Sequence, residues 1–213
     1  MINSVLLKIV TLFYPIGVKR NSSEYLNHPF IKEVNEGLQL KRVDPESENR
    51  QKWELLTQIL QSEFPDYRVE IVDTHIHVDV ISMRKKDNLH SGKYLPQTID
   101  ILKSYVLPLY SLYSYKVENN RKIMNFNIVE NPELVKVEKI LLEIFSELTY
   151  LPLKYGKVKF PGLLLPNEII TNPDFYTAFF YDIFNLKLEI IDDNDYKAYE
   201  FEQFLMSLAM PNM

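Results

Sequence analysis

The chain of 213 residues lacks cysteine and has only five glycines. Without cysteine it can form no disulfide, no thiolate nucleophile and no zinc site with sulfur ligands, which fits a reducing compartment. The five glycines stand too far apart to build a phosphate-binding loop. The patterns G-x-G-x-x-G, G-x-x-x-x-G-K-[ST], H-E-x-x-H and G-x-S-x-G are all missing. We therefore expect a protein without a bound cofactor.

Long stretches rich in Gly, Ser or Pro are also missing, so the sequence offers no flexible linker between domains. No repeat of fixed period occurs either. With 46% hydrophobic and 25% charged residues, the composition is that of an ordinary globular protein. We expect one domain over residues 1–213, with a helical lead at 1–64, a sheet at 65–130 and mainly helices at 131–213.

The first 18 residues are apolar enough to suggest a signal peptide or a membrane anchor. Lys8 interrupts the run, no cationic segment precedes it, and Pro15 ends it far short of a membrane span. A helical period instead gathers four apolar side chains on one face, namely Ile2, Leu6, Ile9 and Phe13. We therefore expect a cytoplasmic protein whose first helix packs on the core, with no membrane association.

Positive charge is scarce in the last quarter of the chain. Up to Phe160 there are 22 Lys and Arg against 20 Asp and Glu, whereas from Pro161 onward there are 2 against 9, and the whole chain carries −5. Binding to nucleic acid phosphates needs clustered Lys and Arg that displace counterions. The charge balance therefore argues against nucleic acid as a partner.

The segment Tyr105–Lys116 is the most informative stretch for the fold. A period of two places apolar side chains on both of its faces, which is typical of a central strand covered on both sides. Asn119 and Asn120 follow, and asparagine tolerates the positive φ of a tight primed turn. We expect a hairpin that continues into a second strand at 122–130.

Three Asx-Pro pairs predict helix starts, because the Asx side chain can cap free N–H groups and proline needs no acceptor in the first turn. These pairs are Asp44-Pro45, Asn131-Pro132 and Asn172-Pro173. The helix after the third pair, D-F-Y-T-A-F-F-Y-D-I-F, is aromatic enough to be buried on most of its surface. A last helix is expected around Asp195–Ala209.

Two further segments have the pattern of strands. Residues 67–83 alternate like one half-buried strand, and residues 99–117 form either one bent strand or a short element followed by a strand. The order of helices, sheet and helices is that of a segregated α+β fold. We expect a single α+β domain in which an antiparallel sheet of three to five strands is flanked by N-terminal and C-terminal helices.

One short motif suggests a metal site. The stretch 72–79 contains D-T-H-x-H-x-D, which resembles the first-strand metal motif of amidohydrolase-type barrel enzymes. Its candidate ligands are Asp73, His75, His77 and Asp79. In a strand the two histidines would project to the same side about 7 Å apart, a spacing that one divalent metal can use. That family's barrel takes about 250 residues and adds ligands on later strands, whereas here only His90 follows the motif. The other interpretation is a strand face exposed to solvent or to a partner.

The acidic segment Glu189–Glu202 also has two interpretations. One is a solvated loop and the first turn of a helix, where carboxylates face the positive end of the helix dipole. The other is a docking surface for a basic protein, in which charge sets the encounter rate and an exposed tyrosine supplies an anchor. The residues of this predicted surface are Asp192, Asp193, Asp195, Tyr196, Tyr199, Glu200 and Glu202.

The order of four sequence features along the chain suggests a family. They are the S-x-E-Y-L stretch at Ser22–Leu26, a Trp-bearing helix that ends at Phe64-Pro65, the L-P-L-Y-S-L-Y run and the D-F-Y-T-A-F-F-Y-D-I-F helix. In outline they resemble small bacterial immunity-type proteins that accompany polymorphic or contact-dependent toxins. The resemblance implies a cytoplasmic, non-enzymatic protein that binds one toxin domain and blocks it.

Three classes of function therefore stay open on the sequence. The first is a protein-binding inhibitor, an immunity protein that neutralises a basic toxin domain through its acidic C-terminal quarter. The second is a metal-dependent hydrolase that uses the histidine motif. The third is a scaffold protein of unknown partner.

Overall fold

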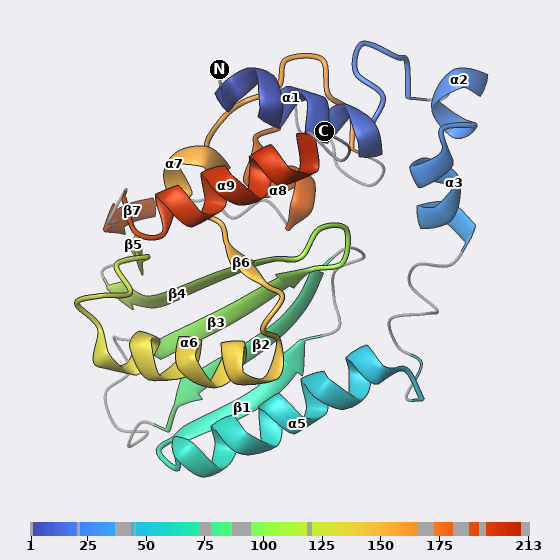
Figure 1. Ribbon diagram of the computed structural model, residues 1–213. Helices are drawn as coiled ribbons and strands as arrows, with labels where there is room; N and C mark the ends of the chain where they lie inside the picture. The colour runs from blue at the N-terminus through green and yellow to red at the C-terminus, as the bar shows by residue number, and fades with distance from the viewer. Residues whose placement is uncertain are drawn as a thin grey trace.

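Seven strands, counted among the residues that the structure describes, form one sheet with helices on both faces (Figure 1). The computed structural model describes residues 2–20, 22–36, 44, 46–72, 78–86, 95–118, 121–165, 173–180, 188–191 and 195–209. The strands are β1 (Tyr67–Val72), β2 (Val78–Lys85), β3 (Leu95–Ser104), β4 (Leu109–Glu118), β5 (Arg121–Asn125), β6 (Thr149–Tyr150) and β7 (Leu188–Ile191). Their order is β1-β2-β3-β4-β5-β7, and β6 lies beside β4. Neighbours are antiparallel, except that β6 runs parallel to β4 and β7 parallel to β5.

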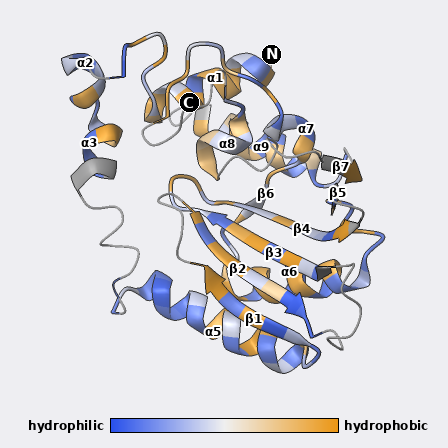
Figure 2. Ribbon diagram, turned by 180° about the vertical axis from the view of Figure 1, so that it is seen from behind, coloured by the Kyte–Doolittle hydropathy of each residue, from blue (hydrophilic) through white to orange (hydrophobic). Residues whose placement is uncertain are grey.

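Helices from the two ends of the chain and from its middle cover opposite faces of this sheet. The helices are α1 (Ile2–Phe13), α2 (Ser23–Leu26), α3 (Pro29–Glu36), α5 (Glu48–Glu63), α6 (Pro132–Ile144), α7 (Leu153–Gly156), α8 (Phe175–Phe179) and α9 (Ala198–Ala209). One face packs against α5 and α6 in what we call the α5–α6 core. The other packs against α1, α8 and α9 in the terminal-helix core. Figure 2 shows the strands between these two layers, seen from behind. The predicted single α+β domain is therefore confirmed.

Strand β4 lies at the centre of the sheet and is buried on both faces. Leu109 and Tyr113 belong to the terminal-helix core, and Tyr110 and Leu112 to the α5–α6 core. Along one edge β4 pairs with β3, and along the other it pairs first with β6 and then with β5. The predicted central strand is confirmed, as is the hairpin, in which Glu118 pairs with Arg121. The second strand, expected at 122–130, ends at Asn125.

The predicted start of this strand at Tyr105 is wrong. Residues 105–108 form the turn between β3 and β4. Ser104 explains the turn, because its hydroxyl oxygen accepts hydrogen bonds from the N–H groups of Val106 and Leu107. Pro108 has no N–H group to donate to a neighbouring strand. Its carbonyl oxygen accepts a hydrogen bond from the N–H of Thr149.

Residues 67–83 are a hairpin and not the single strand that their alternation predicts. Tyr67 pairs with Lys85 and Val72 with Val80, so the chain reverses between β1 and β2. Residues 73–77, which join the two strands, lie outside the described residues. This hairpin and the short strands β6 and β7 raise the strand number to seven instead of the three to five expected. Strands of two and four residues are too short to show a period in the sequence.

Of the three Asx-Pro pairs, Asn131-Pro132 caps its helix as predicted, whereas Pro45 and Asn172 of the other two pairs lie outside the described residues. Asn131 accepts hydrogen bonds from the N–H groups of Glu133 and Leu134, with proline in the first turn of α6. The caps of α5 and α8 are Ser47 and Asp174, which follow the prolines of the predicted pairs by two residues and one residue. In both cases the side chain accepts from the N–H three residues on, as Asx and Ser caps do.

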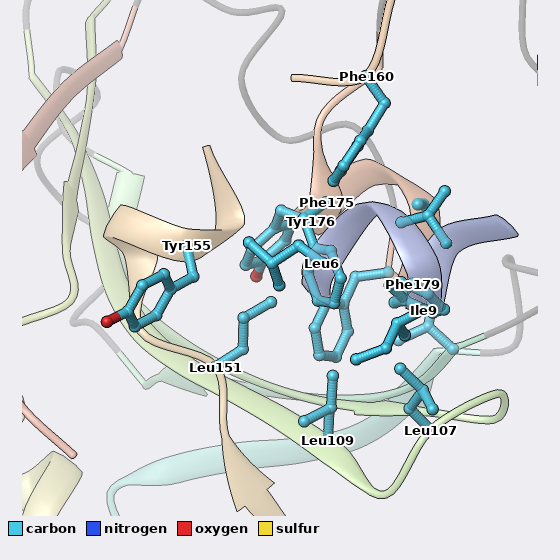
Figure 3. Packing of buried hydrophobic residues seen from close by; sticks show 14 of the residues in the cluster. Leu6, Ile9, Leu107, Leu109, Leu151, Tyr155, Phe160, Phe175, Tyr176 and Phe179 are labelled. Carbon is cyan, nitrogen blue, oxygen red and sulfur yellow. The ribbon is translucent and has the colours of Figure 1, made fainter. Parts of the chain in front are cut away.

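The terminal-helix core joins the two ends of the chain over the sheet (Figure 3). Leu6 and Ile9 of α1 are buried, as the sequence predicts, and they pack with Phe175 and Phe179 of α8. Every residue of α8 is buried, as predicted for this aromatic segment, whereas residues 181–184 of the predicted helix lie outside the described residues. Tyr176 also donates its hydroxyl hydrogen to the Ser111 hydroxyl at 2.9 Å, which fixes α8 to β4. None of the helices in the described part of the chain combines the length and apolar character that a membrane span needs.

Asp100 of β3 is a buried carboxyl on the same sheet face as the terminal helices. It lies between Ser82 of β2 and Tyr113 of β4 in the strand register. The Tyr113 hydroxyl donates to its Oδ2 at 3.2 Å, and its Oδ1 has no hydrogen-bond partner among the described residues. Burial raises the pKa of the Asp100 carboxyl, and the nearby hydroxyls and the charge of Lys122 offset only part of this. The charged form of Asp100 therefore opposes folding.

We expect Asp100→Asn to stabilise the protein at pH 7. The pKa of Asp100 in the folded protein lies above its ordinary value of 3.8. Below pH 3.8 the carboxyl is neutral and the protein keeps its full free energy of unfolding; as the pH rises, ionisation of the buried carboxyl lowers that free energy. Asparagine does not titrate, and its amide oxygen can still accept from Tyr113. The unfolding midpoint should rise by about 2–4 °C at pH 7, as for ~1 kcal/mol in a domain of this size, with the gain vanishing near pH 3.8. Thermal unfolding across this pH range measures it, with Asp66→Asn, at an exposed aspartate, as the control that should show no gain.

Candidate functional site

The predicted docking surface falls on α9 and on the turn that leads into it. Asp192 and Asp193 lie outside the described residues. Of the others, Asp195, Tyr199 and Glu200 are exposed, and Gln203 continues the same outer face one turn along. Tyr199 is 69% exposed, which is unusual for a large aromatic side chain. Asp195, Tyr199 and Gln203 are spaced four residues apart and Glu200 follows Tyr199 directly, so this face combines two carboxylates with one aromatic ring. We call Asp195, Tyr199, Glu200 and Gln203 the α9 row.

Local contacts order the α9 row. Asp195 accepts a hydrogen bond from Lys154 Nζ at 2.9 Å, and this hydrogen bond is the main cause that raises the pKa of the Lys154 amine. Gln203 Nε2 donates to the Tyr199 hydroxyl at 2.6 Å. An exposed ion pair such as Lys154–Asp195 adds about 0–1 kcal/mol to stability. Its effect is therefore on the orientation of the side chains more than on the stability of the fold.

Tyr196 points in the opposite direction, toward the α5–α6 core. Its hydroxyl donates to Glu138 Oε2 at 2.5 Å, and the Tyr110 hydroxyl donates to Oε1 of the same carboxylate. Its ring packs against Tyr150 with centroids 5.4 Å apart. The exposed anchor of the predicted surface is either Tyr196 or Tyr199, and Tyr196 does not supply it, because both its hydroxyl and its ring have partners inside.

Lys197 completes this buried cluster. Its Nζ lies 3.1 Å from Glu138 Oε1 and 3.1 Å from the Tyr110 hydroxyl. Its backbone has a φ of 50°, a left-handed conformation that costs a residue with a side chain about 1–2 kcal/mol. The ion pair with Glu138 holds Lys197 in this conformation. We call Tyr110, Glu138, Tyr196 and Lys197 the Glu138 cluster.

The Glu138 cluster connects the two helical layers around one edge of β4. Tyr196 packs against the α5–α6 core, whereas Ala198, two residues later, belongs to the terminal-helix core. Glu138 comes from α6 and Tyr110 from β4. Burial and the neighbouring Glu138 charge raise the pKa of the Tyr110 hydroxyl, so this phenol stays a proton donor to the carboxylate. The start of α9 is therefore fixed to both the sheet and the opposite layer.

Glu202 lies at the border of the α9 row, where it is half-buried. It accepts a hydrogen bond from the Tyr155 hydroxyl, whose pKa is raised mainly by burial. The Tyr155 ring stacks on Phe201 with centroids 5.1 Å apart. The predicted surface therefore divides into an outward set, Asp195, Tyr199 and Glu200, and an inward set, Tyr196 and Glu202.

The predicted metal motif is described only at its end. Asp73, His75 and His77 lie outside the described residues. Asp79 lies on β2, where its carboxylate is buried and pairs with Lys103 Nζ at 3.1 Å. Asn49 also donates to Asp79 at 3.2 Å, and the Lys103 Nζ lies 5.0 Å from the centroid of the Tyr105 ring. Across the described segments no group of three or more His, Asp and Glu side chains could hold a metal ion. Asp79 thus has a structural role as the counter-ion of a buried lysine.

The position of Glu138 in the sequence indicates that it is buried, although it belongs to none of the predicted functional motifs. It falls on the apolar stripe of α6, beside Leu134, Val137 and Leu141. A carboxylate on the buried face of a helix needs partners inside the protein. The pattern therefore predicts a buried polar cluster at Glu138, whereas no local pattern names Tyr110 or Lys197 as its partners.

Comparison of the chain with models of known protein families, with curated protein sequences and with solved structures found no match. The resemblance to immunity-type proteins thus stays a prediction from the order of sequence features.

We expect Tyr196→Phe to destabilise the protein by about 1.5–3 kcal/mol, the usual value of a hydrogen bond to a charged group. The change removes only the hydroxyl that donates to Glu138 and keeps the ring beside Tyr150. Tyr199→Phe is the matched control on the exposed side of the same turn and should change stability by less than about 0.5 kcal/mol. Urea unfolding of the two variants makes the comparison, and equal stabilities would contradict the role given to the Glu138 cluster.

Proposed function

We propose that this protein is a non-enzymatic, protein-binding inhibitor, and that it neutralises a basic toxin domain in the manner of an immunity protein. The observation that supports the proposal is the α9 row, in which Tyr199 is exposed between Asp195 and Glu200 on a helix fixed at its first turn. Tyrosine is enriched at protein interfaces and among the few residues that dominate their binding energy.

Charge gives the α9 row a preference for basic partners. The last quarter of the chain holds nine acidic and two basic residues, and one of the two, Lys197, has its charge paired with Glu138. An acidic surface raises the encounter rate with a positively charged partner and disfavours acidic ones. The aromatic ring of Tyr199 would then supply the contact that slows dissociation.

Because α9 is held in place, it loses less conformational entropy when a partner binds. A surface whose side chains and backbone are already ordered loses less conformational entropy when a partner docks. The Glu138 cluster holds the backbone at Tyr196 and Lys197, and Lys154 orients Asp195. An inhibitor that blocks a toxin by covering its active surface needs such a rigid face, because its affinity depends on slow dissociation.

The experiment is affinity capture from a lysate of the organism that encodes the chain, with the double variant Tyr199→Ala and Glu200→Lys beside the unchanged protein. We expect the unchanged protein to retain a basic protein whose binding weakens with added salt, and the double variant to bind it roughly tenfold or more weakly. Co-expression of the captured protein should arrest growth, and the unchanged chain should restore it where the double variant does not.

The matched control is Glu54→Lys with Leu55→Ala on α5, an exposed carboxylate next to an exposed apolar side chain on the opposite face of the sheet. It should bind like the unchanged protein. Equal binding by the α9 variant, or a captured protein without toxicity, would contradict the proposal. Stoichiometric zinc or manganese in the purified protein, lost on His75→Ala, would instead support the metal-dependent hydrolase.

A further inference from the structure

A groove of about 270 Å³ opens at the end of the sheet next to the first residue of α6. Strands β3, β4, β5 and β7 and the cap residue Asn131 form its walls. The lining residues are Gln97, Ser114, Tyr115, Lys116, Ile123, Asn125, Asn131 and Ile191. Three of them carry carboxamides, which is a high share for so small a groove.

Hydrogen bonds at the base of the groove determine which atoms of two carboxamides remain available. Asn125 Oδ1 accepts from the N–H of Asn127 at 2.8 Å, so the amide nitrogen of Asn125 is left over. Gln97 Nε2 donates to the Glu133 carboxylate at 3.1 Å, so the carbonyl oxygen of Gln97 is left over. Neither leftover atom has a protein partner among the described residues. The reverse orientation of either carboxamide would oppose two donors or two acceptors.

These two carboxamides therefore offer the groove one hydrogen-bond donor, on Asn125, and one acceptor, on Gln97. This pair is complementary to a peptide amide, whose carbonyl accepts and whose N–H donates. Ile123 and Ile191 add apolar surface on which aliphatic side chains of a peptide can pack, and Ile191 is 46% exposed. The ring of Tyr115 packs on the opposite face of the sheet, against the terminal-helix core. The groove thus lacks a described aromatic ring on which a sugar could stack.

The groove lies close to the α9 row along the chain. Ile191 ends β7, and Asp195 begins the row four residues later. Because an extended chain spans at most about 3.5 Å per residue, the Cα atoms of these two residues are within about 14 Å. A single partner of ordinary interface size would cover both features.

We infer that the groove binds an extended peptide segment of the partner through a backbone amide, and so forms a second contact of the same interface. This inference rests on the proposed function for the source of the peptide. The chemistry of recognition depends on the groove alone, through the Asn125 amide nitrogen, the Gln97 carbonyl oxygen and the two isoleucines.

The test uses the capped peptide acetyl-Val-Ala-Val-N-methylamide and the full chain with ¹⁵N in its Asn and Gln side chains. We expect the side-chain amide signals of Asn125, Gln97 and Asn131 to shift together and saturate, with a dissociation constant in the millimolar range that one small contact gives. Asn125→Asp keeps the oxygen that accepts from Asn127 and removes the donor, so it should weaken binding at least about fivefold. Gln58→Glu makes the same chemical change at an exposed position of α5 and should leave binding unchanged.

Three results would overturn the inference. They are the absence of saturable shifts at Asn125 and Gln97, equal binding by the Asn125→Asp variant, and stronger shifts at the same signals with maltose than with the peptide. None of these results depends on the natural partner, so they would not contradict the proposed function, which the capture experiment on the α9 row tests separately. Conversely, peptide binding at the groove together with failed capture would refute the proposed inhibitor and leave the groove as a peptide site.

Discussion

Burial of β4 on both faces is the constraint on which the rest of the structure depends. A strand with apolar side chains on both sides needs a helical layer above and below it. Its middle residues Tyr110, Leu112 and Tyr113 have no exposed surface. Helices α5 and α6 supply one layer from the middle of the chain, and α1, α8 and α9 supply the other from its two ends. The two ends of the chain are therefore brought together by the need to cover one strand.

The Glu138 cluster follows from this arrangement. Because β6 pairs with only the first two residues of β4, and β5 begins to pair at Ser114, the chain can pass from one layer to the other around the edge between them. Tyr196 and Lys197 make that passage, and a buried carboxylate holds them there. Removing one member of a buried ion pair costs more than the pair itself contributes, so such clusters fix geometry more than they add stability. The consequence for function is a rigid α9 row.

Buried charges elsewhere in the fold have structural partners of the same kind. Asp79 pairs with Lys103 between α5 and the sheet, and the lysine lies near the Trp53 and Phe145 rings. Asp100 has hydroxyl neighbours and a raised pKa, yet it occupies a packed sheet face. The α9 row and the groove beside β7 both present polar groups to solvent. These two surfaces are consequently where recognition of a partner is proposed.

The sequence by itself determined the elements whose signal is local: the α1 and α6 stripes, the Asn131 cap, the buried aromatic α8, the β4–β5 hairpin and the acidic character of the last quarter. Each depends on residues within a few positions of one another. Only the tertiary structure decided that Tyr196 turns inward while Tyr199 stays exposed, that Asp79 belongs to Lys103, and that Gln97, Asn125 and Ile191 share one groove. Those outcomes depend on which strands are neighbours, and strand order brings together residues nearly a hundred positions apart without leaving a periodic trace in the sequence.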